Sequence, residues 1–334
     1  MSYAHPVLLS ISIAVLSASL ASAQPAAPPV APHFQVVLLG TAGGPTINPD
    51  RSGISTLIIA GNERLVFDLG RNAMSAFPRL GITSGDVTKV FFTHLHSDHV
   101  VDLPAFLLFP WASQGRSAPL EVWGPTGTRQ MTEHLVKAFA FDIQVRQADE
   151  RFPASGIQVK ATDVKEGVAY QANGVTVRAF LVDHGPVAPA LGYRIDYAGH
   201  SVVISGDTMP SDNLVKQAKG VDVLIHELGR WKKDPALNRS PDELMPNSRL
   251  ASGQTLEQLR AIIAHHTDGE EAGRIFARVA PKLAVFSHYN VAPASALPLV
   301  RQNYPGPVEF GEDLMTIDID DAVSVRRFIT PRAN

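Results

Sequence analysis

Three histidines and an aspartate form the pattern H-x-H-x-D-H directly after an apolar segment, residues 87–92. Alternate residues of an extended segment point in the same direction, so His94 and His96 can bind one metal ion. Asp98 and His99 lie just past the turn and can face a second metal ion nearby. The chain contains no cysteine, so histidine and carboxylate side chains must hold any metal. The pattern therefore predicts a site for two metal ions.

The order of elements around this pattern resembles the metallo-β-lactamase-fold hydrolases. An apolar strand, a threonine, the H-x-H-x-D-H motif and then an apolar helix follow one another. The resemblance extends over nearly all of residues 34–328. It implies an α+β fold, a four-layer αββα sandwich, with a dinuclear zinc site at one edge and further ligands at the ends of later strands.

Three later strand ends offer the ligands that such a family requires. His184 follows an expected strand at 175–182, and His288 closes another at 283–287. Between them, Asp207 follows an expected strand at 201–204. The resemblance implies one zinc ion bound by His94, His96 and His184, a second bound by Asp98, His99 and His288, and Asp207 as the bridge.

Two further pairs of residues resemble the tRNase Z-like branch of this superfamily. They are His226-Glu227 and His266-Thr267, accompanied by the segments 182–186 and 191–194. In that branch the histidine before threonine contacts the scissile phosphate, and the glutamate orients it for proton donation to the leaving group. The resemblance gives these roles to His266 and Glu227, while Asp98 positions the attacking water. His265 leaves the register of the proton donor open by one residue.

The chain also departs from the tRNA-processing enzymes of that branch. Those enzymes carry a long, basic arm between the ligands that match His184 and Asp207, but here only 23 residues separate the two. An extra segment at 230–254 instead lies between Glu227 and His266, and we expect a loop or lid there. Exported arylsulfatases and cyclic-nucleotide phosphodiesterases of the same superfamily also lack the arm.

The remaining sequence alternates between short apolar segments and helical patterns. Expected strands lie at 35–39, 56–60, 64–67, 87–92, 175–182, 191–197, 201–204, 221–226, 283–287 and 315–327. Expected helices lie at 126–141, 212–219, 257–264 and 269–279. Two packed sheets with helices outside fit this order, whereas a single parallel doubly wound sheet does not.

The amino terminus has the layout of a secretory signal peptide. An apolar run at 7–21 ends in the small-residue pattern Ala21-Ser22-Ala23. We expect a signal peptide at 1–23, a Pro/Ala-rich tether at 24–33 and a hydrolase domain at 34–330. These expectations imply a periplasmic or secreted protein with no membrane span after cleavage, and a homodimer is possible.

The charge balance bears on the partners. The 334 residues include 29 Lys and Arg against 32 Asp and Glu, a net charge of −3. Such a balance offers no overall attraction for a polyanion, so we expect no nucleic acid among the partners.

The expected activity is hydrolysis of small anionic esters, phosphodiesters before aryl sulfates, by water activated between two zinc ions. Lactone or thioester hydrolysis and a non-catalytic zinc-binding module are the further alternatives. A diiron oxygen reductase is disfavoured, because that group has glutamate at the position of His96.

Overall fold

The structure is a computed structural model that describes residue 1, residues 33–229 and residues 255–328. The expected signal peptide, most of the expected tether and the segment 230–254 lie outside the described residues. Within the described part, no helix is long and apolar enough to cross a membrane.

The first sheet has eight strands in the order β15-β14-β1-β2-β3-β4-β5-β6. Their bounds are β1 (Phe34–Gly40), β2 (Ser55–Ala60), β3 (Glu63–Phe67), β4 (Lys89–Phe91), β5 (Leu120–Gly124), β6 (Val159–Asp163), β14 (Thr316–Ile319) and β15 (Val323–Arg326). The central strand β1 is buried along its whole length because both faces of the sheet are covered.

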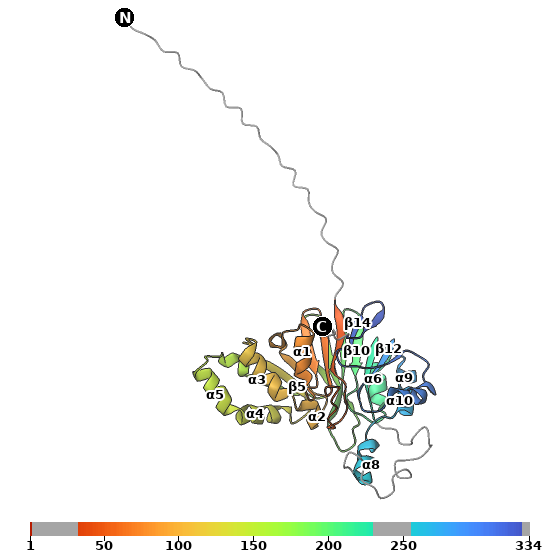
Figure 1. The fold of residues 1–334 in the computed structure, drawn as a ribbon. Helices are drawn as coiled ribbons and strands as arrows, with labels where there is room; N and C mark the ends of the chain where they lie inside the picture. Colours follow the sequence, from red (N-terminus) through yellow and green to blue (C-terminus); the bar gives the residue numbers. More distant parts are fainter. Residues whose placement is uncertain (2–32, 230–254, 329–334) are drawn as a thin grey trace, which may run out of the picture. The chain divides into compact units, whose positions relative to one another are not determined.

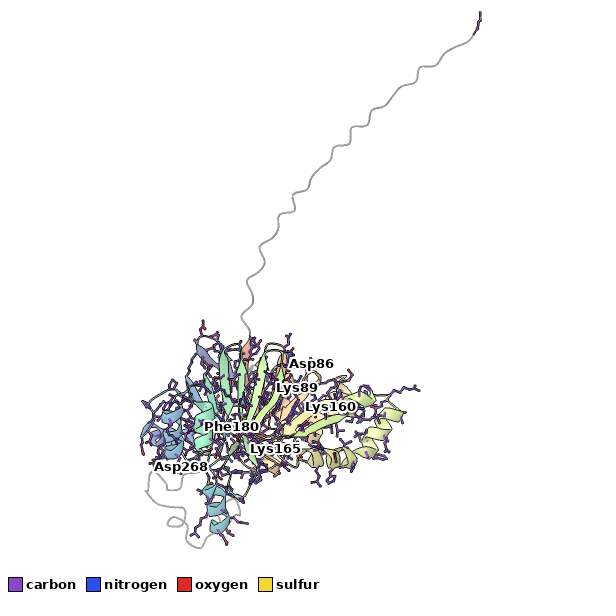
Figure 2. All side chains as sticks on the ribbon, turned by 180° about the vertical axis from the view of Figure 1, so that it is seen from behind. Asp86, Lys89, Lys160, Lys165, Phe180 and Asp268 are labelled. Atoms are coloured by element: carbon purple, nitrogen blue, oxygen red, sulfur yellow. The ribbon has the colours of Figure 1, made fainter. Side chains whose placement is uncertain are left out.

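The second sheet has seven strands in the order β13-β12-β11-β10-β9-β8-β7. Their bounds are β7 (Gly167–Ala172), β8 (Val175–Val182), β9 (Ala190–Tyr197), β10 (His200–Ile204), β11 (Val223–Leu228), β12 (Leu283–Tyr289) and β13 (Val308–Phe310). The chain passes from the first sheet to the second in the turn between β6 and β7, where Figure 2 labels Lys165.

Helices cover the outer face of each sheet, as Figure 1 shows. Their bounds are α1 (Ala76–Arg79), α2 (Ser97–Val100), α3 (Leu103–Ser113), α4 (Thr128–Ala138), α5 (Ala140–Ala148), α6 (Asp212–Ala218), α8 (Leu256–Ala264), α9 (Gly269–Val279) and α10 (Pro293–Arg301). The predicted four-layer αββα sandwich is thereby confirmed.

Three hydrophobic clusters hold the layers together, and β1 shows how one strand serves two of them. Val36 and Leu38 face the cluster between the two sheets. Val37 and Leu39 point the other way and join the cluster beneath α3, as the two-residue period of a strand requires. The third cluster packs α6, α9 and α10 on the second sheet and includes the fully buried Phe180, labelled in Figure 2.

Most of the expected strands are present, although their limits differ. The expected strand at 87–92 is shortened to β4, and the strand expected at 315–327 is the hairpin of β14 and β15. The helix expected at 126–141 is divided between α4 and α5, with a break at Phe139. Sequence patterns gave no sign of β5, β6, β7 or β13.

Strand direction gathers the site at one edge of the sandwich. Strands β10, β11 and β12 run parallel, so their carboxyl ends lie at the same edge. Strand β8 is antiparallel to β9, and β9 is antiparallel to β10, so β8 ends at that edge too. The loop after β4 approaches it from the first sheet, where Thr93 O accepts a hydrogen bond from Leu191 N at 2.9 Å.

Candidate metal centre

The loop after β4 carries the H-x-H-x-D-H motif into the space between the sheets. His94 is fully buried, and His99 is 1% exposed. His96 stands at the amino end of the short helix α2 and is exposed to solvent. The turn into α2 therefore points two of these imidazoles inward and leaves one at the surface.

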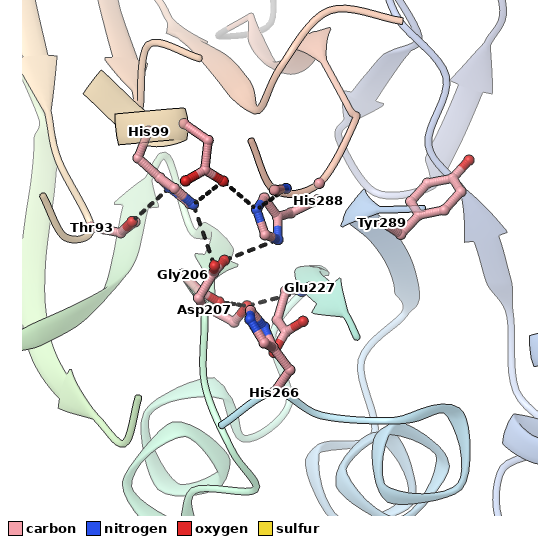
Figure 3. Close-up of polar contacts among 12 residues, drawn as sticks. Thr93, His99, Gly206, Asp207, Glu227, His266, His288 and Tyr289 are labelled. Carbon is pink, nitrogen blue, oxygen red and sulfur yellow. Dashed lines mark hydrogen bonds and ion pairs between the residues drawn. The ribbon is translucent and has the colours of Figure 1, made fainter. Parts of the chain in front are cut away.

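Asp68, which follows β3, fixes this loop from the adjacent strand. Its carboxylate accepts hydrogen bonds from the backbone N–H and the hydroxyl of Thr93, each at 2.9 Å. Its Oδ2 also lies 2.9 Å from Nδ1 of His99, which leaves Nε2 of His99 to face the site, as Figure 3 shows. A carboxylate behind a histidine is a common support for a metal ligand.

Sequence reasoning missed Asp68, although the sequence offered a signal. Asp68 directly follows β3, and the next strand in the chain, β4, precedes the histidine motif. Its backbone φ of 59° is unusual for a residue other than glycine. The hydrogen bonds to Thr93 and His99 maintain this conformation.

His94, His96 and His184 form one cluster of imidazoles. One ring nitrogen from each lies within 4.8 Å of the others, and the three pairs of ring centroids are 4.7, 4.9 and 5.2 Å apart. Nδ1 of His184 lies 3.0 Å from the backbone carbonyl of His265, so its Nε2 faces the cluster. The structure thus brings together the three residues predicted for the first metal ion.

Asp98, His99 and His288 form a second cluster beside the first, and their candidate ligand atoms also lie within 4.8 Å of one another. Oδ2 of Asp98 is 3.7 Å from Nε2 of His99 and 3.1 Å from Nε2 of His288. The backbone N–H of Gly44 lies 3.0 Å from the same nitrogen of His288. These are the residues predicted for the second metal ion.

Asp207 lies between the two clusters. Its Oδ2 is 3.9 Å from Nε2 of His94, 4.0 Å from Nε2 of His184 and 3.4 Å from Nε2 of His99. Its Oδ1 is 3.1 Å from Nδ1 of His288. Figure 3 shows the carboxylate of Asp207 directed toward both His99 and His288. This placement matches the one expected of a bridging ligand.

The donor atoms of this centre suit metal binding because they are buried and unsatisfied. Within the described part of the chain, five of these atoms have no hydrogen-bond partner: Nε2 of His94, His99 and His184, Nδ1 of His288 and Oδ1 of Asp207. Buried polar atoms normally have a partner, and five that converge on one place call for a ligand that accepts lone pairs. Imidazole and carboxylate donors fit zinc.

The electrostatics differ between the two clusters. Burial lowers the pKa of His99 in the second cluster, but the charges of Asp207 and Asp68 outweigh burial and raise that pKa well above its usual range. Burial lowers the pKa of His94 well below its usual range, and it also lowers the pKa of His96 and of His184. Neutral imidazoles are the form that binds metal. Burial raises the pKa of Asp207, but the charges of His288 and His99 outweigh burial and hold that pKa well below its usual range. A buried anionic carboxylate requires positive charge beside it.

A histidine and a glutamate adjoin the centre, and one of the two adjacent histidines pairs with the glutamate. Nδ1 of His266 lies 3.2 Å from Oε1 of Glu227, and the ring centroids of His266 and His184 are 5.1 Å apart. His265 instead offers its backbone carbonyl to His184. Of the two adjacent histidines, His266 is therefore the one paired with Glu227.

The pairing changes the protonation of His266. Burial lowers its pKa, but the charge of Glu227 and the hydrogen bond to it outweigh burial and raise the pKa to about 9. At neutral pH both ring nitrogens therefore carry a proton. Nδ1 is directed at Glu227, so the proton on Nε2 is available for donation.

Two cavities open beside the centre, separated by the loop at 43–47. The first, called here the α8 cavity, has a volume of about 100 Å³ and is lined by residues 43–46 together with Leu259, Ile262, Ile263, His266, His288 and Asn290, among others. The second, called here the Asp98 cavity, has a volume of about 230 Å³ and is lined by residues 44–47 together with Arg71, Asp98 and Val101, among others.

Comparison with known proteins identifies the family. Residues 64–289, more than half of the chain, match the Beta-lactamase superfamily domain. The chain belongs to the metallo-β-lactamase superfamily. It is a hydrolase of this superfamily and is tRNase Z-like: Ribonuclease Z of Mycobacterium sp. (strain KMS) is 33% identical over 299 residues, which cover 88% of this chain and 99% of that relative.

Solved structures support the metallo-β-lactamase fold. Human tRNase Z, short form, has a TM-score of 0.59 at 20% identity, covering 85% of this chain and 98% of the human chain. Zn²⁺-bound PqqB from Methylobacterium extorquens has a TM-score of 0.59 at 16% identity, covering 85% of this chain and 100% of its own. At these identities the likeness concerns the fold alone.

One prediction about this superfamily member was wrong, namely that nucleic acid is not among its partners. A relative at 33% identity is named ribonuclease Z, which points to an RNA substrate. The net charge of −3 averages over the whole chain and does not describe the field at the metal centre.

Proposed function

We propose that this protein is a phosphodiesterase that uses two zinc ions and acts on RNA or on short nucleotides derived from it. The observation that carries the proposal is the set of five buried donor atoms that make no hydrogen bond and converge on one place, adjacent to the protonated His266. The similarity to ribonuclease Z supports a phosphodiester as the bond that is cleaved.

The two zinc sites follow the two clusters. His94, His96 and His184 would hold one ion, Asp98, His99 and His288 would hold the other, and Asp207 would contact both. When bound, two zinc ions supply Lewis acidity, lower the pKa of water and neutralise charge on the phosphate. Zn²⁺-bound PqqB, which shares the fold, supports the choice of metal.

The protein's own groups divide the proton transfers between the two cavities. Asp98 lines the Asp98 cavity, where its carboxylate would orient the attacking water and accept a proton from it. His266 lines the α8 cavity, where its Nε2–H would protonate the departing oxygen. Glu227 holds the ring of His266 and keeps it protonated. Water therefore enters from one side of the phosphate, and the alcohol leaves on the other.

Metal analysis combined with a substrate panel tests this proposal. Purified protein should contain two zinc ions per chain and should hydrolyse dinucleotides, bis(p-nitrophenyl) phosphate or RNA with an unpaired 3′ end. The panel should include aryl sulfates, lactones and thioesters. Preferential hydrolysis of one of these three classes would show that phosphodiesters are not the preferred substrates. Two iron ions per chain would contradict the zinc assignment.

We also propose that the protein is exported and meets its substrate outside the cytoplasm. The apolar run at 7–21 and the pattern Ala21-Ser22-Ala23 support this proposal. In that setting the substrates would be extracellular RNA or its fragments.

A further inference from the structure

Helix α8 shows an apolar stripe that packs toward the active site. The helix begins at a capping box in which Thr255 and Gln258 exchange hydrogen bonds. Leu259, Ile262 and Ile263 follow at the spacing that places them on one face of a helix. His266 comes two residues after the helix ends, so α8 and the proton donor occupy adjacent parts of the chain.

This stripe lines the α8 cavity with side chains that are mostly buried. Leu259 and Ile263 are 5% and 6% exposed, yet neither belongs to any of the three hydrophobic clusters formed by the described residues. Together with Ile262 they line the cavity that also contains His266 and His288. The apolar wall of α8 therefore stands opposite the metal centre.

Exposed apolar side chains lie at both cavities beside the centre. Ile262 is 39% exposed and lines the α8 cavity, and Ile47 and Val101, at 74% and 52%, line the Asp98 cavity. Large apolar side chains exposed together commonly mark a binding surface. Among the described residues that line the α8 cavity, the ionisable ones are Glu227, His266 and His288, all of which belong to the centre itself.

From this arrangement we propose that the α8 cavity binds an uncharged, flat ring, a nucleobase, on the leaving-group side of the scissile phosphodiester. The inference rests on the proposed function, because His266 defines the leaving-group side. It makes Ile262 and its neighbours on α8 residues that determine specificity.

The size and chemistry of the cavity agree with a ring. Its volume of about 100 Å³ is of the order of the roughly 150 Å³ apolar cavity that binds benzene in an engineered protein. Apolar side chains cover the faces of a planar group. Asn290 also lines the cavity; its Nδ2 donates a hydrogen bond to the backbone carbonyl of Gly43, and its amide oxygen can meet the polar edge of the ring.

Binding of a leaving-group analogue to metal-free protein tests the inference without turnover. Adenosine should bind, as followed by saturation-transfer NMR and titration, and ribose should bind at least tenfold more weakly. Ile262→Asp should raise the Kd of adenosine about tenfold, whereas Ile262→Leu should retain binding. Val145→Asp on α5 is the matched control, because Val145 is 46% exposed and does not line the cavity.

Turnover then separates this inference from the proposed function. With zinc present, Ile262→Asp should raise KM for a dinucleotide about tenfold and leave kcat within twofold. If adenosine binding depends on Ile262 but no phosphodiester is cleaved, the ring site stands and the proposed function fails. If phosphodiesters are cleaved while Ile262→Asp changes neither Kd nor KM, or Val145→Asp changes them equally, the ring site is wrong and the function stands.

Discussion

Oε1 of Glu227 lies 3.2 Å from Nδ1 of His266 and also accepts hydrogen bonds from the backbone N–H groups of Thr267, at 2.9 Å, and Thr208, at 3.3 Å. Two backbone groups therefore fix the carboxylate before it meets the imidazole. The glutamate is 3% exposed and belongs to β11. Glu227, held in place on β11, therefore sets both the orientation of the His266 ring and its protonation.

Removing the charge of Glu227 should lower the pKa of His266. In Glu227→Gln burial still lowers the pKa and the charge of Asp207 still raises it, so the pKa should fall from about 9 toward 6.5, its value in an unfolded chain. Because the folded pKa is raised, the ion pair stabilises the protein fully below pH 6.5, and this stabilisation is lost as pH rises through about 9. NMR titration of the histidines in metal-free protein measures the shift. An unchanged pKa would show that Glu227 does not control the protonation of His266.

Loss of the proton donor should slow turnover without releasing metal. His266→Ala should reduce kcat by about 10²–10⁴-fold for alkyl leaving groups and far less for p-nitrophenolate, which departs without a proton. Metal content and kcat should be measured together, with His265→Ala as the neighbouring control. Should His265→Ala show this dependence on the leaving group instead, the assignment of the donor to His266 would be wrong.

Removing the carboxylate between the two clusters should affect both metal ions. Asp207→Ala should lower the zinc content of both sites and abolish turnover, since Asp207 approaches histidines of each cluster. Elemental analysis after dialysis against dilute chelator measures the loss. Asp212→Ala, at a side chain that is 88% exposed on α6, is the control. Full occupancy in Asp207→Ala would exclude a bridging role.

Asp68 should influence metal affinity although it does not face the metal. Asp68→Asn keeps the size of the side chain but weakens its hold on the ring of His99, and we expect zinc affinity to fall about 10–100-fold. A competitive chelator titration gives the affinity. Asp222→Asn is a matched control, because Asp222 is also buried and accepts a backbone hydrogen bond from Ser201 at 2.7 Å. Equal losses in both variants would point to general destabilisation.

The amino terminus gives a prediction that is independent of the site. Expressed with an intact export pathway, the chain should be cleaved after Ala23 and begin at Gln24. Mass spectrometry of the protein recovered outside the cytoplasm measures this end. Recovery of the intact chain in the cytoplasm would contradict export.

The sequence was most informative where chemistry and spacing coincide. The resemblance to the metallo-β-lactamase-fold hydrolases predicted that His94, Asp207 and His288 meet, although His94 follows a strand of the first sheet and the other two belong to the second. The role of Asp68 depends on β3 and β4 being neighbours in the sheet, which no local pattern records. Which of His265 and His266 pairs with Glu227 likewise depends on the backbone conformation directly after α8.

Two of the strands that escaped prediction share a physical cause. Strands β6 and β7 lie at the ends of their sheets and are only partly buried. They therefore lack the apolar character that makes a central strand such as β1 recognisable. The net charge of the chain led to the wrong prediction about nucleic acid, because a sum over all residues does not describe the charge at the metal centre.

The two clusters of the centre draw their ligands from both halves of the sandwich. His94, His96, Asp98 and His99 follow a strand of the first sheet, whereas His184, Asp207 and His288 belong to the second. Any ion held between them acts as a cross-link that exists only in the folded chain. Mass action then couples the metal supply to thermal stability, since a ligand that binds only the folded state adds RT ln(1 + [L]/Kd) to the free energy of unfolding. Zinc depletion would therefore abolish activity and also lower thermal stability, with the loss of stability concentrated at the interface between the two sheets.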